Sequence, residues 1–232
     1  MTQDQQLDAA LALVRSYTPE FGWIWKSDSK LHRAIGWVFD KLGMVGYMDA
    51  FYTTLRYEVG RPNDAKNGQV KNEFEVFVHE GQHSIDAKNL TFPLFALIYG
   101  FPQILALLAV PLAIVLVLAT GSWLGLLGLL ALALAAPIPA PGRVWAELRG
   151  YRVSLSSLYW YEGIPADLEQ PYIEEFFSYF YGPSYYFMGW LGKGYIKKRL
   201  QFYLDELKAG RGYETKYLSD VRNLCLSFAK AE

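Results

Sequence analysis

The sequence predicts an α+β fold, mostly helical, in which a small mixed core carries an inserted hydrophobic helical hairpin. Two observations indicate this fold class. Amphipathic helical patterns recur towards both ends of the chain and around its middle, whereas one short segment alternates like a β-strand. Residues 89–142 contain no Asp, Glu, Lys or Arg, so all 22 basic and 23 acidic side chains lie outside them. This stretch divides the chain into residues 1–91, 92–142 and 143–232.

The composition excludes several classes of protein. The formal net charge is −1 and there is no basic run, which argues against a nucleic-acid-binding protein. The single cysteine, Cys225, excludes an internal disulfide framework and a zinc module built from cysteines. Hydrophobic residues make up 52% of the chain and aromatic residues 16%, both high for a soluble domain. This excess is not spread evenly, because the uncharged stretch is almost entirely apolar.

The first region is predicted to contain two helices and then a strand. Residues 1–16 form a polar amphipathic helix without the cleavage pattern of a signal peptide. A second amphipathic helix surrounds His32, which we expect at the surface or at its boundary. Residues 50–59 alternate and are rich in β-formers, which predicts one strand ending at the turn-like residues 60–64.

Residues 79–83 read His-Glu-Gly-Gln-His, the HExxH pattern, within a helical segment. Residues four apart share a helix face, so His79 and His83 can bind one metal ion. Zinc suits these ligands and lowers the pKa of a bound water to about 7, and Glu80 lies where it can accept the proton. The alternative is two solvated histidines. Asp86, one turn further on, is either a partner that orients a ligand imidazole or an ordinary polar residue.

HExxH supplies two ligands, so a third must come from elsewhere. The metzincin class would need a histidine at position 89, which is Asn89, and is therefore excluded. A di-iron carboxylate site would need a second Glu-x-x-His unit, which the sequence lacks.

The uncharged stretch predicts two hydrophobic helices joined by a turn. Residues 93–119 are long enough to cross about 30 Å of hydrocarbon, with kinks at Pro102 and Pro111. After the break at residues 121–122, residues 123–136 span a bilayer only marginally. Two crossings, a hairpin that dips into the membrane and returns, and a hairpin buried in a protein assembly are all consistent with this pattern.

The flanking charges predict the topology of the hairpin. Lys88 precedes it, Arg143, Arg149 and Arg152 follow it, and the turn between its halves is uncharged. The positive-inside bias then places both hydrophilic regions on the cytoplasmic side of a membrane.

Glu147 is the best candidate for the third ligand. A hairpin returns the chain to the side that it left, so Glu147 re-emerges beside the HExxH helix. Rival carboxylates lie further along the chain, at Glu162, Asp167 and Glu169. Tyr151, one helical turn beyond Glu147, is placed to steady a developing oxyanion, with Tyr159 as the alternative; packing is the commoner role for both.

The last region begins with an aromatic segment, residues 154–195. If the hairpin enters a membrane, these side chains suit the interface region at the lipid headgroups. If the protein belongs to an assembled particle, they suit a subunit interface. The third alternative is packing in the core. Two further amphipathic helices, residues 193–209 and 213–229, carry no motif.

Together these features resemble zinc metallopeptidases of the gluzincin-like class, and more narrowly metallopeptidases encoded by tailed bacteriophages. The resemblance covers about residues 45–190. It rests on the alternating strand, the HExxH helix with its nearby aspartate, the proline-containing hydrophobic hairpin, the Glu-x-x-x-Tyr helix start at 147–151 and the aromatic run at 180–188. The resemblance implies a zincin-like core, Zn²⁺ held by His79, His83 and Glu147, and Glu80 as general base.

The function expected from these features is zinc-dependent hydrolysis of peptide bonds at a cytoplasmic membrane surface. The expected partners are a peptide or protein substrate, a lipid bilayer, and other phage virion proteins or further copies of the chain. An intramembrane protease is disfavoured, because Lys71, Glu73 and Glu75 close to the motif would be costly in hydrocarbon. The alternatives are a virion structural or ejection protein, whose metal site is structural or vestigial, and a self-cleaving maturation protease.

Overall fold

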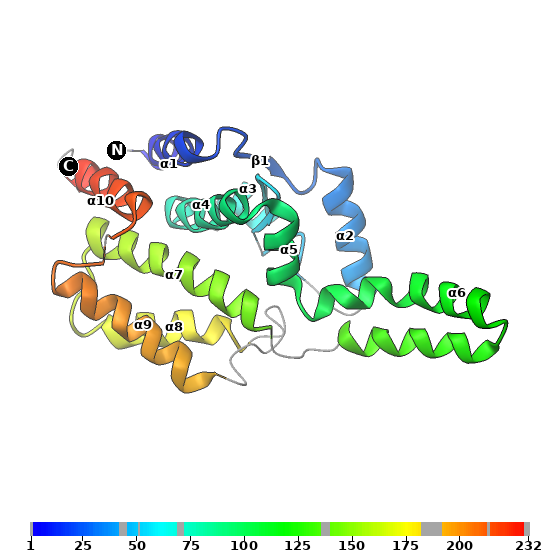
Figure 1. Cartoon of the computed structure of the whole chain (residues 1–232). Helices are drawn as coiled ribbons and strands as arrows, with labels where there is room; N and C mark the ends of the chain where they lie inside the picture. The colour runs from blue at the N-terminus through cyan, green and yellow to red at the C-terminus, as the bar shows by residue number, and fades with distance from the viewer. Residues whose placement is uncertain are drawn as a thin grey trace.

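The computed structural model describes residues 2–41, 46–50, 52–68, 72–135, 140–181, 192–212 and 214–229. These residues are mostly helical and include one small sheet, which confirms the predicted α+β class (Figure 1). The helices are α1 (Gln3–Tyr17), α2 (Lys30–Lys41), α3 (Asn63–Lys66), α4 (Glu73–Leu90), α5 (Phe92–Gly100), α6 (Ala109–Thr120), α7 (Pro141–Tyr161), α8 (Glu169–Tyr179), α9 (Lys193–Lys208) and α10 (Lys216–Ala229). Two 3₁₀ segments, η1 (Gln103–Leu108) and η2 (Trp123–Ala135), and three strands, β1 (Gly22–Trp25), β2 (Thr53–Leu55) and β3 (Glu58–Arg61), complete the fold.

The sheet has the strand order β1-β3-β2, with β1 parallel and β2 antiparallel to β3. The prediction of one strand over residues 50–59 is therefore wrong, since the chain turns back between β2 and β3. Only Arg56, with a φ of 60°, and Tyr57 form this turn. Neither is a glycine or proline, so the alternating pattern runs through the turn without a visible break.

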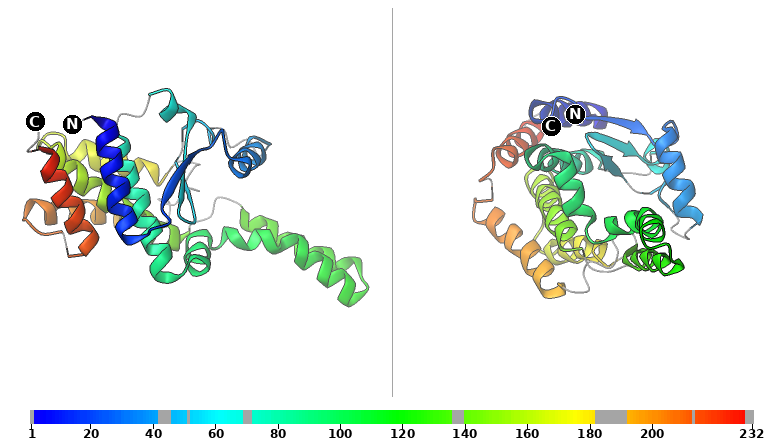
Figure 2. Two further views of the ribbon diagram at one scale, coloured as in Figure 1. Left: turned by 90° about the horizontal axis from the view of Figure 1, so that it is seen from above. Right: turned by 45° about the vertical axis from the view of Figure 1, so that its right-hand side comes forward.

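Helix α4, which carries the HExxH motif, lies between the sheet side of the molecule and α7 (Figures 1 and 2). It begins after Asn72, whose side-chain oxygen accepts a hydrogen bond from the backbone N–H of Glu75. Phe74, Phe77, Val78 and Ile85 recur at helical spacing and are buried, so they form the core face of α4, whereas Val70, at the same spacing, lies outside the described residues. The opposite face is buried as well, because α7 covers it.

Two hydrophobic clusters hold the helices together. The first joins α1, α4 and α10 to the sheet, and the second joins α7, α8 and α9. Helix α7 contributes to both, through Val153 and Leu155 respectively. Of the four aromatic residues of α8, Phe176 and Phe177 belong to the second cluster and Tyr172 packs against it, so core packing accounts for these three, whereas Tyr179 is exposed. The later part of the aromatic segment, residues 182–191, lies outside the described residues.

A buried ion pair ties the sheet to the start of α4. Arg61 donates from Nε and Nη2 to the two carboxylate oxygens of Glu73, at 3.0 and 2.5 Å, and Tyr52 donates its hydroxyl to the same carboxylate at 2.6 Å. The guanidinium also lies over the rings of Trp23 and Trp25, 4.4 and 4.2 Å from their centres.

Replacing Arg61 with Ala is expected to destabilise the protein by about 3–5 kcal/mol, because it leaves the Glu73 carboxylate buried without its countercharge. The ion pair of Glu206 with the exposed Arg211 is the control, and Arg211→Ala is expected to lower stability far less than Arg61→Ala does. Urea denaturation of both variants measures the difference, and equal losses would contradict the assignment.

The uncharged stretch divides into two parts with different surroundings. Helix α5 packs on α4 and α7 and buries Phe95, whereas residues 103–135 project from the body as a hairpin (Figures 1 and 2). The single helix predicted over residues 93–119, with kinks at Pro102 and Pro111, is instead divided into α5, η1 and α6, and α5 ends at Gly100. Pro102 lacks the N–H that would continue the helical hydrogen bonding.

Small residues bring the two arms of the hairpin into close contact. Ala109 and Ala113 are buried between them. A Cβ on Gly125 would lie 2.3 Å from the backbone N of Val117, and one on Gly128 would lie 2.7 Å from that of Ala113. Such backbone-to-backbone packing requires residues without large side chains.

Among the helices that the structure describes, none combines the length and apolar character needed to span a membrane.

Candidate metal centre

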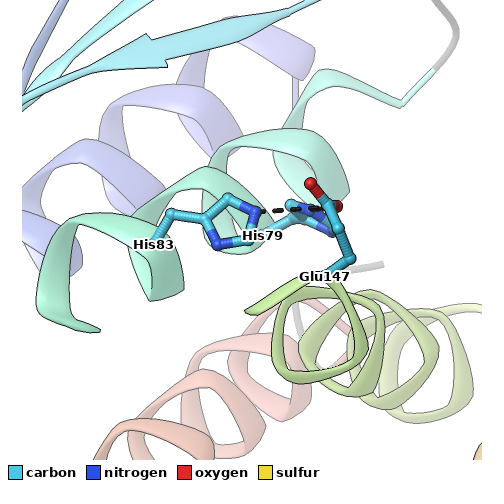
Figure 3. A group of neighbouring side chains, drawn as sticks. All are labelled: His79, His83 and Glu147. Atoms are coloured by element: carbon cyan, nitrogen blue, oxygen red, sulfur yellow. Dashed lines mark ion pairs between the residues drawn. The ribbon is translucent and has the colours of Figure 1, made fainter. Parts of the chain in front are cut away.

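Helices α4 and α7 bring three possible metal ligands together, as Figure 3 shows. His79 and His83 lie one turn apart on α4, and Glu147 faces them from the first half of α7. Nε2 of His79 lies 3.5 Å from Oε2 of Glu147, and Nε2 of His83 lies 3.7 Å from the same oxygen. The return of the hairpin thus places Glu147 beside the histidines, as the sequence predicted.

The spacing of these atoms suits a metal ion. Nitrogen and oxygen ligands bind zinc at about 2.0–2.1 Å, so two ligands of a tetrahedral ion lie about 3.4 Å apart. The two measured distances are close to this value, and the candidate ligand atoms all lie within 4.8 Å of one another. The three residues could therefore hold one ion, and two imidazoles with a carboxylate suit zinc and other first-row transition metals.

Charge within the group favours a cation. Burial by itself would raise the pKa of Glu147, but the two histidine rings reverse the effect and hold its pKa well below the usual range. Burial would likewise lower the pKa of His83, but contact with Glu147 raises this pKa to about 9. An ionised carboxylate thus attracts a positive charge into a buried site, and a bound metal would displace the proton that His83 otherwise holds.

Tyr99 of α5 fixes the orientation of Glu147. Its hydroxyl donates to Oε1 at 2.5 Å, which leaves Oε2 directed at the histidines. The guanidinium of Arg143 lies 4.8 Å from the centre of the Tyr99 ring. Helix α5, the first helix of the uncharged stretch, therefore contributes to the site through Tyr99. The hydropathy pattern does not predict this role.

Ser154 of α7 contacts Nδ1 of His79, the ring nitrogen that does not face Glu147. Its Oγ lies 3.1 Å from Nδ1 of His79, and the same hydroxyl is hydrogen-bonded to Glu75. With Nε2 reserved for a metal, Nδ1 carries the proton and donates it to Ser154, whose own hydroxyl donates to the carboxylate. This relay fixes the ring orientation and raises the basicity of the ligand.

Ser154→Ala is expected to weaken metal binding about 10- to 100-fold, the usual effect of removing such a supporting hydrogen bond. Ser157→Ala is the matched control, because the Ser157 hydroxyl donates to the backbone oxygen of residue 154 and not to His79. Competition with a chromophoric chelator measures both affinities, and a similar affinity in the two variants would remove Ser154 from the site.

Gly150 lets α7 approach the ring of His79. A Cβ at this position would lie 2.6 Å from both Cε1 and Nε2 of the imidazole. Gly150→Ala is expected to push the His79 ring out of its preferred rotamer, which costs about 1 kcal/mol or more. Metal binding should therefore weaken about fivefold or more. Alanine favours helices over glycine, so the helix content should be kept.

Gly194→Ala in α9 is the control, because a Cβ there meets nothing within 4 Å. Elemental analysis at limiting zinc compares the two variants. Full zinc retention by Gly150→Ala would show that the ring is free to move.

Glu80 is not one of the three grouped ligands. It accepts a hydrogen bond from the hydroxyl of Thr54 on β2 and is partly exposed. Strand β2 lies at one edge of the sheet and contacts α4. An edge strand therefore lies beside the HExxH helix, within the segment where the sequence predicts a strand.

Asp86 binds residues other than the histidines. It accepts two hydrogen bonds from Arg149 of α7, both at 2.8 Å, and one from Gln82 at 2.8 Å. Within the described part of the chain, Nδ1 of His83 has no hydrogen-bond partner. Asp86 therefore joins α4 to α7 instead of orienting a ligand ring.

The other sequence candidates take various places. The ring of Tyr151 is buried edge-on against His79, with centres 4.7 Å apart, and Tyr159 packs against the second cluster. Of the rival carboxylates, Glu162 and Asp167 are exposed, and Glu169 pairs with Lys208.

His32, expected at the surface, is buried, which makes that expectation wrong. The sheet covers its face of α2, so that a Cβ on Gly60 would lie 2.7 Å from its Nε2. Its Nδ1 lies 2.7 Å from the hydroxyl of Tyr47, and it does not join the three grouped ligands.

No protein-family model, curated protein or solved structure matches this chain.

Proposed function

We propose that this protein is a metal-dependent hydrolase. More particularly, we propose a zinc-dependent peptidase of the gluzincin-like class, with His79, His83 and Glu147 as ligands and Glu80 as general base. The observation that carries the proposal is the convergence of two imidazole nitrogens and one carboxylate oxygen from α4 and α7. Glu80 directly follows one of these ligands on the same helix, as the HExxH arrangement requires.

A zinc ion held by these three residues would supply Lewis acidity, which polarises a peptide carbonyl and makes a nearby water acidic. Glu80 would accept the proton of that water and pass it to the leaving amine. Thr54 supports this role, because its hydrogen bond fixes the position of the Glu80 carboxylate. Tyr151 packs on His79 and would keep that ring in place.

A peptide is the favoured substrate because an edge strand lies beside Glu80. Strand β2 pairs with β3 on one side, and within the described sheet it has no neighbour on the other. An extended peptide can pair with such an edge and bring its carbonyl groups past the catalytic glutamate.

The hairpin supports a membrane location for this activity. The exposed large side chains of its α6 arm are all apolar and cover about 200° of the helix surface, on the side away from the buried Ala109 and Ala113: Val110, Leu112, Ile114, Val115 and Leu118. Trp123, close to the tip, is 75% exposed. A protein partner would cover one face of the hairpin, whereas lipid would surround it, so we place the hairpin in a bilayer.

Vesicle flotation tests this location. The full chain is expected to float with phosphatidylcholine vesicles, and Leu118→Asp is expected to weaken flotation. Lys208→Asp, an exposed change far along the chain, is the control. A wild-type protein that stays in the soluble fraction would contradict the membrane location without affecting the metal centre.

The activity itself is tested with the purified full chain and an unfolded protein substrate such as casein. We expect cleavage when zinc is present, loss of cleavage with a chelator, and recovery when zinc is restored. Cleavage that persists in chelator would indicate another mechanism or a contaminant. A chain that binds zinc but cleaves no peptide in a mixed library would contradict the peptidase proposal.

The second candidate function is a membrane-inserting structural component, such as a virion ejection protein, with a purely structural metal. The exposed apolar surface of the hairpin favours it. The two candidates differ at Glu80, which a peptidase requires and a structural site does not.

A further inference from the structure

A second site with a different chemistry lies behind the metal centre. A pocket of about 130 Å³ is lined by residues of α4, α7, α9 and α10, and by Thr215 just before α10. Gln82 is its α4 residue, and because it lies two residues from Glu80, the two point about 200° apart around the helix axis. The pocket is therefore separate from the proposed catalytic face.

The lining of this pocket carries positive charge. Arg149, Arg152 and Arg199 line it, and its described lining includes no aspartate or glutamate. The carboxylates of Asp86 and Glu214 bind the first two arginines from outside that lining. The side chains that face the pocket thus provide three guanidinium groups and no acid.

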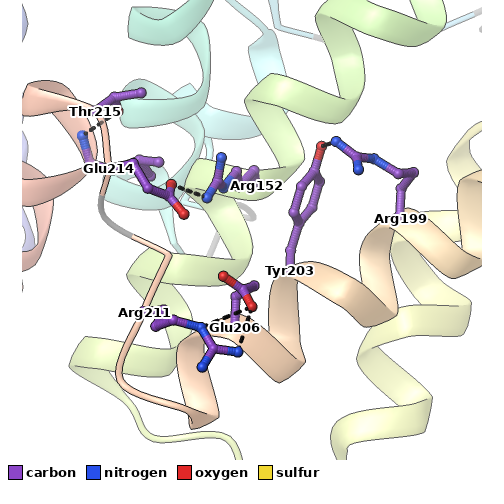
Figure 4. A network of polar contacts seen from close by, with 8 residues as sticks. Arg152, Arg199, Tyr203, Glu206, Arg211, Glu214 and Thr215 are labelled. Atoms are coloured by element: carbon purple, nitrogen blue, oxygen red, sulfur yellow. Dashed lines mark hydrogen bonds and ion pairs between the residues drawn. The ribbon is translucent and has the colours of Figure 1, made fainter.

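Arg199 has a donor nitrogen that forms no hydrogen bond among the described residues. Its Nε is buried and has no hydrogen-bond partner among the described residues, and its Nη2 is only 3.4 Å from the hydroxyl of Tyr203. Figure 4 shows Arg152 and Arg199 on either side of Tyr203, and their guanidinium carbons lie 5.1 and 5.2 Å from the centre of its ring. Of these two guanidinium groups, that of Arg152 is paired with Glu214, whereas that of Arg199 forms no ion pair with a carboxylate among the described residues and remains available to a bound anion.

The neutral polar groups also favour an anion. The hydroxyl of Tyr203 accepts from Arg199, and the hydroxyl of Thr215 accepts from the backbone N–H of Leu218 at 3.2 Å (Figure 4). Each hydroxyl therefore keeps its own proton to donate. The pocket is rich in donors and poor in acceptors.

We propose that this pocket binds a small oxyanion of the phosphate type. Guanidinium groups match the oxygen geometry of phosphate and bind it with charge-assisted hydrogen bonds. The volume of about 130 Å³ is well below the roughly 300–1,000 Å³ of drug-sized ligand sites, so the pocket suits one phosphoryl group and not a whole nucleotide. The phosphoryl group would come either from free phosphate or from a phospholipid headgroup.

Calorimetric titration with inorganic phosphate tests the proposal. The full chain is first freed of metal with a chelator and the chelator is removed, so that phosphate cannot bind at the metal centre. Chloride at the same ionic strength is the blank. We expect saturable binding that Arg199→Gln weakens about tenfold or more, since a charge-assisted hydrogen bond is lost.

Arg211→Gln is the matched control, because Arg211 forms an ion pair with Glu206 outside the pocket (Figure 4). Tyr203→Phe removes only a hydroxyl, and it should also weaken binding if Arg199→Gln fails to fold. Circular dichroism checks the fold of each variant.

A second titration distinguishes the two sources of phosphate. Phosphatidylcholine vesicles with and without phosphatidic acid replace the free anion. An effect of Arg199→Gln confined to phosphatidic acid identifies a headgroup site, and one confined to free phosphate identifies a solute site. The proposal is overturned if neither probe binds, or if Arg199→Gln and Tyr203→Phe bind both probes as well as Arg211→Gln does.

Discussion

Glu147→Gln is expected to remove stoichiometric zinc from the purified protein. The carboxylate oxygen lies 3.5 and 3.7 Å from the two imidazole nitrogens and supplies the negative charge of the group. A glutamine keeps the shape of the side chain but offers a neutral and weaker ligand. Structural zinc sites bind with roughly 10–16 kcal/mol shared among their ligands, so losing one of three should weaken affinity about 100-fold or more.

The control for this variant is Glu162→Gln, which changes a carboxylate that the sequence offered as a rival ligand. Glu162 is exposed, accepts a hydrogen bond from Asn72 and does not belong to the group of His79, His83 and Glu147. The Glu162→Gln variant should therefore retain its full zinc content. Elemental analysis after dialysis measures the zinc content, and His79→Ala, which removes a ligand from the other helix, should match Glu147→Gln.

Thermal stability provides a second readout of the same prediction. A ligand present at about 1,000 times its dissociation constant stabilises the folded state by about 4 kcal/mol. Adding zinc should therefore raise the melting temperature of the wild type and leave that of Glu147→Gln nearly unchanged. Equal zinc content or equal stabilisation in the two proteins would mean that another group provides the third ligand.

The sequence indicates that the three candidate ligands lie together, because the position of each depends on local spacing or on simple topology. His79 and His83 are four residues apart, and a helix alone places them on one face. Glu147 required one further step, the return of the chain through a hairpin, which the uncharged stretch and its glycine-serine turn made visible. These are the parts of the site that a one-dimensional pattern can encode.

The supporting residues could not be predicted in this way, because their roles depend on tertiary contacts. Tyr99 lies in an apolar segment that we expected to continue into the hairpin, yet it donates to Glu147. Gly150 and Ser154 have no local signal, since only the packing of α7 on α4 brings them to His79. Asp86 has the spacing of a supporting residue but binds Arg149, which its sequence position did not reveal.

Prediction of the fold from the sequence fails where a turn contains none of the residues that usually indicate one. The turn at Arg56 and Tyr57 contains no glycine or proline, so the sequence predicts one strand where the structure has β2 and β3. His32 was expected near the surface because the sequence does not show that the sheet packs against α2. In both cases the missing information was the position of a second element.

Glu80→Gln is expected to abolish peptide cleavage while leaving zinc binding intact. The substitution keeps the size of the side chain and its hydrogen bond with Thr54, because an amide oxygen also accepts from a hydroxyl. It removes the group that would accept a proton from water. General-base catalysis contributes about 100- to 10,000-fold in rate, so the residual rate should fall by that factor.

The control is Glu58→Gln on β3, the same change at an exposed position of the sheet, which should keep full activity. The assay compares the rate of casein cleavage at saturating zinc, with the zinc content of each variant measured in the same preparation. Loss of cleavage with full zinc assigns Glu80 to the chemical step, because neither the fold nor the metal has changed. Unchanged cleavage in Glu80→Gln would refute the general-base role. If the wild type holds zinc but also cleaves nothing, the metal has a structural role, in which it joins α4 to α7.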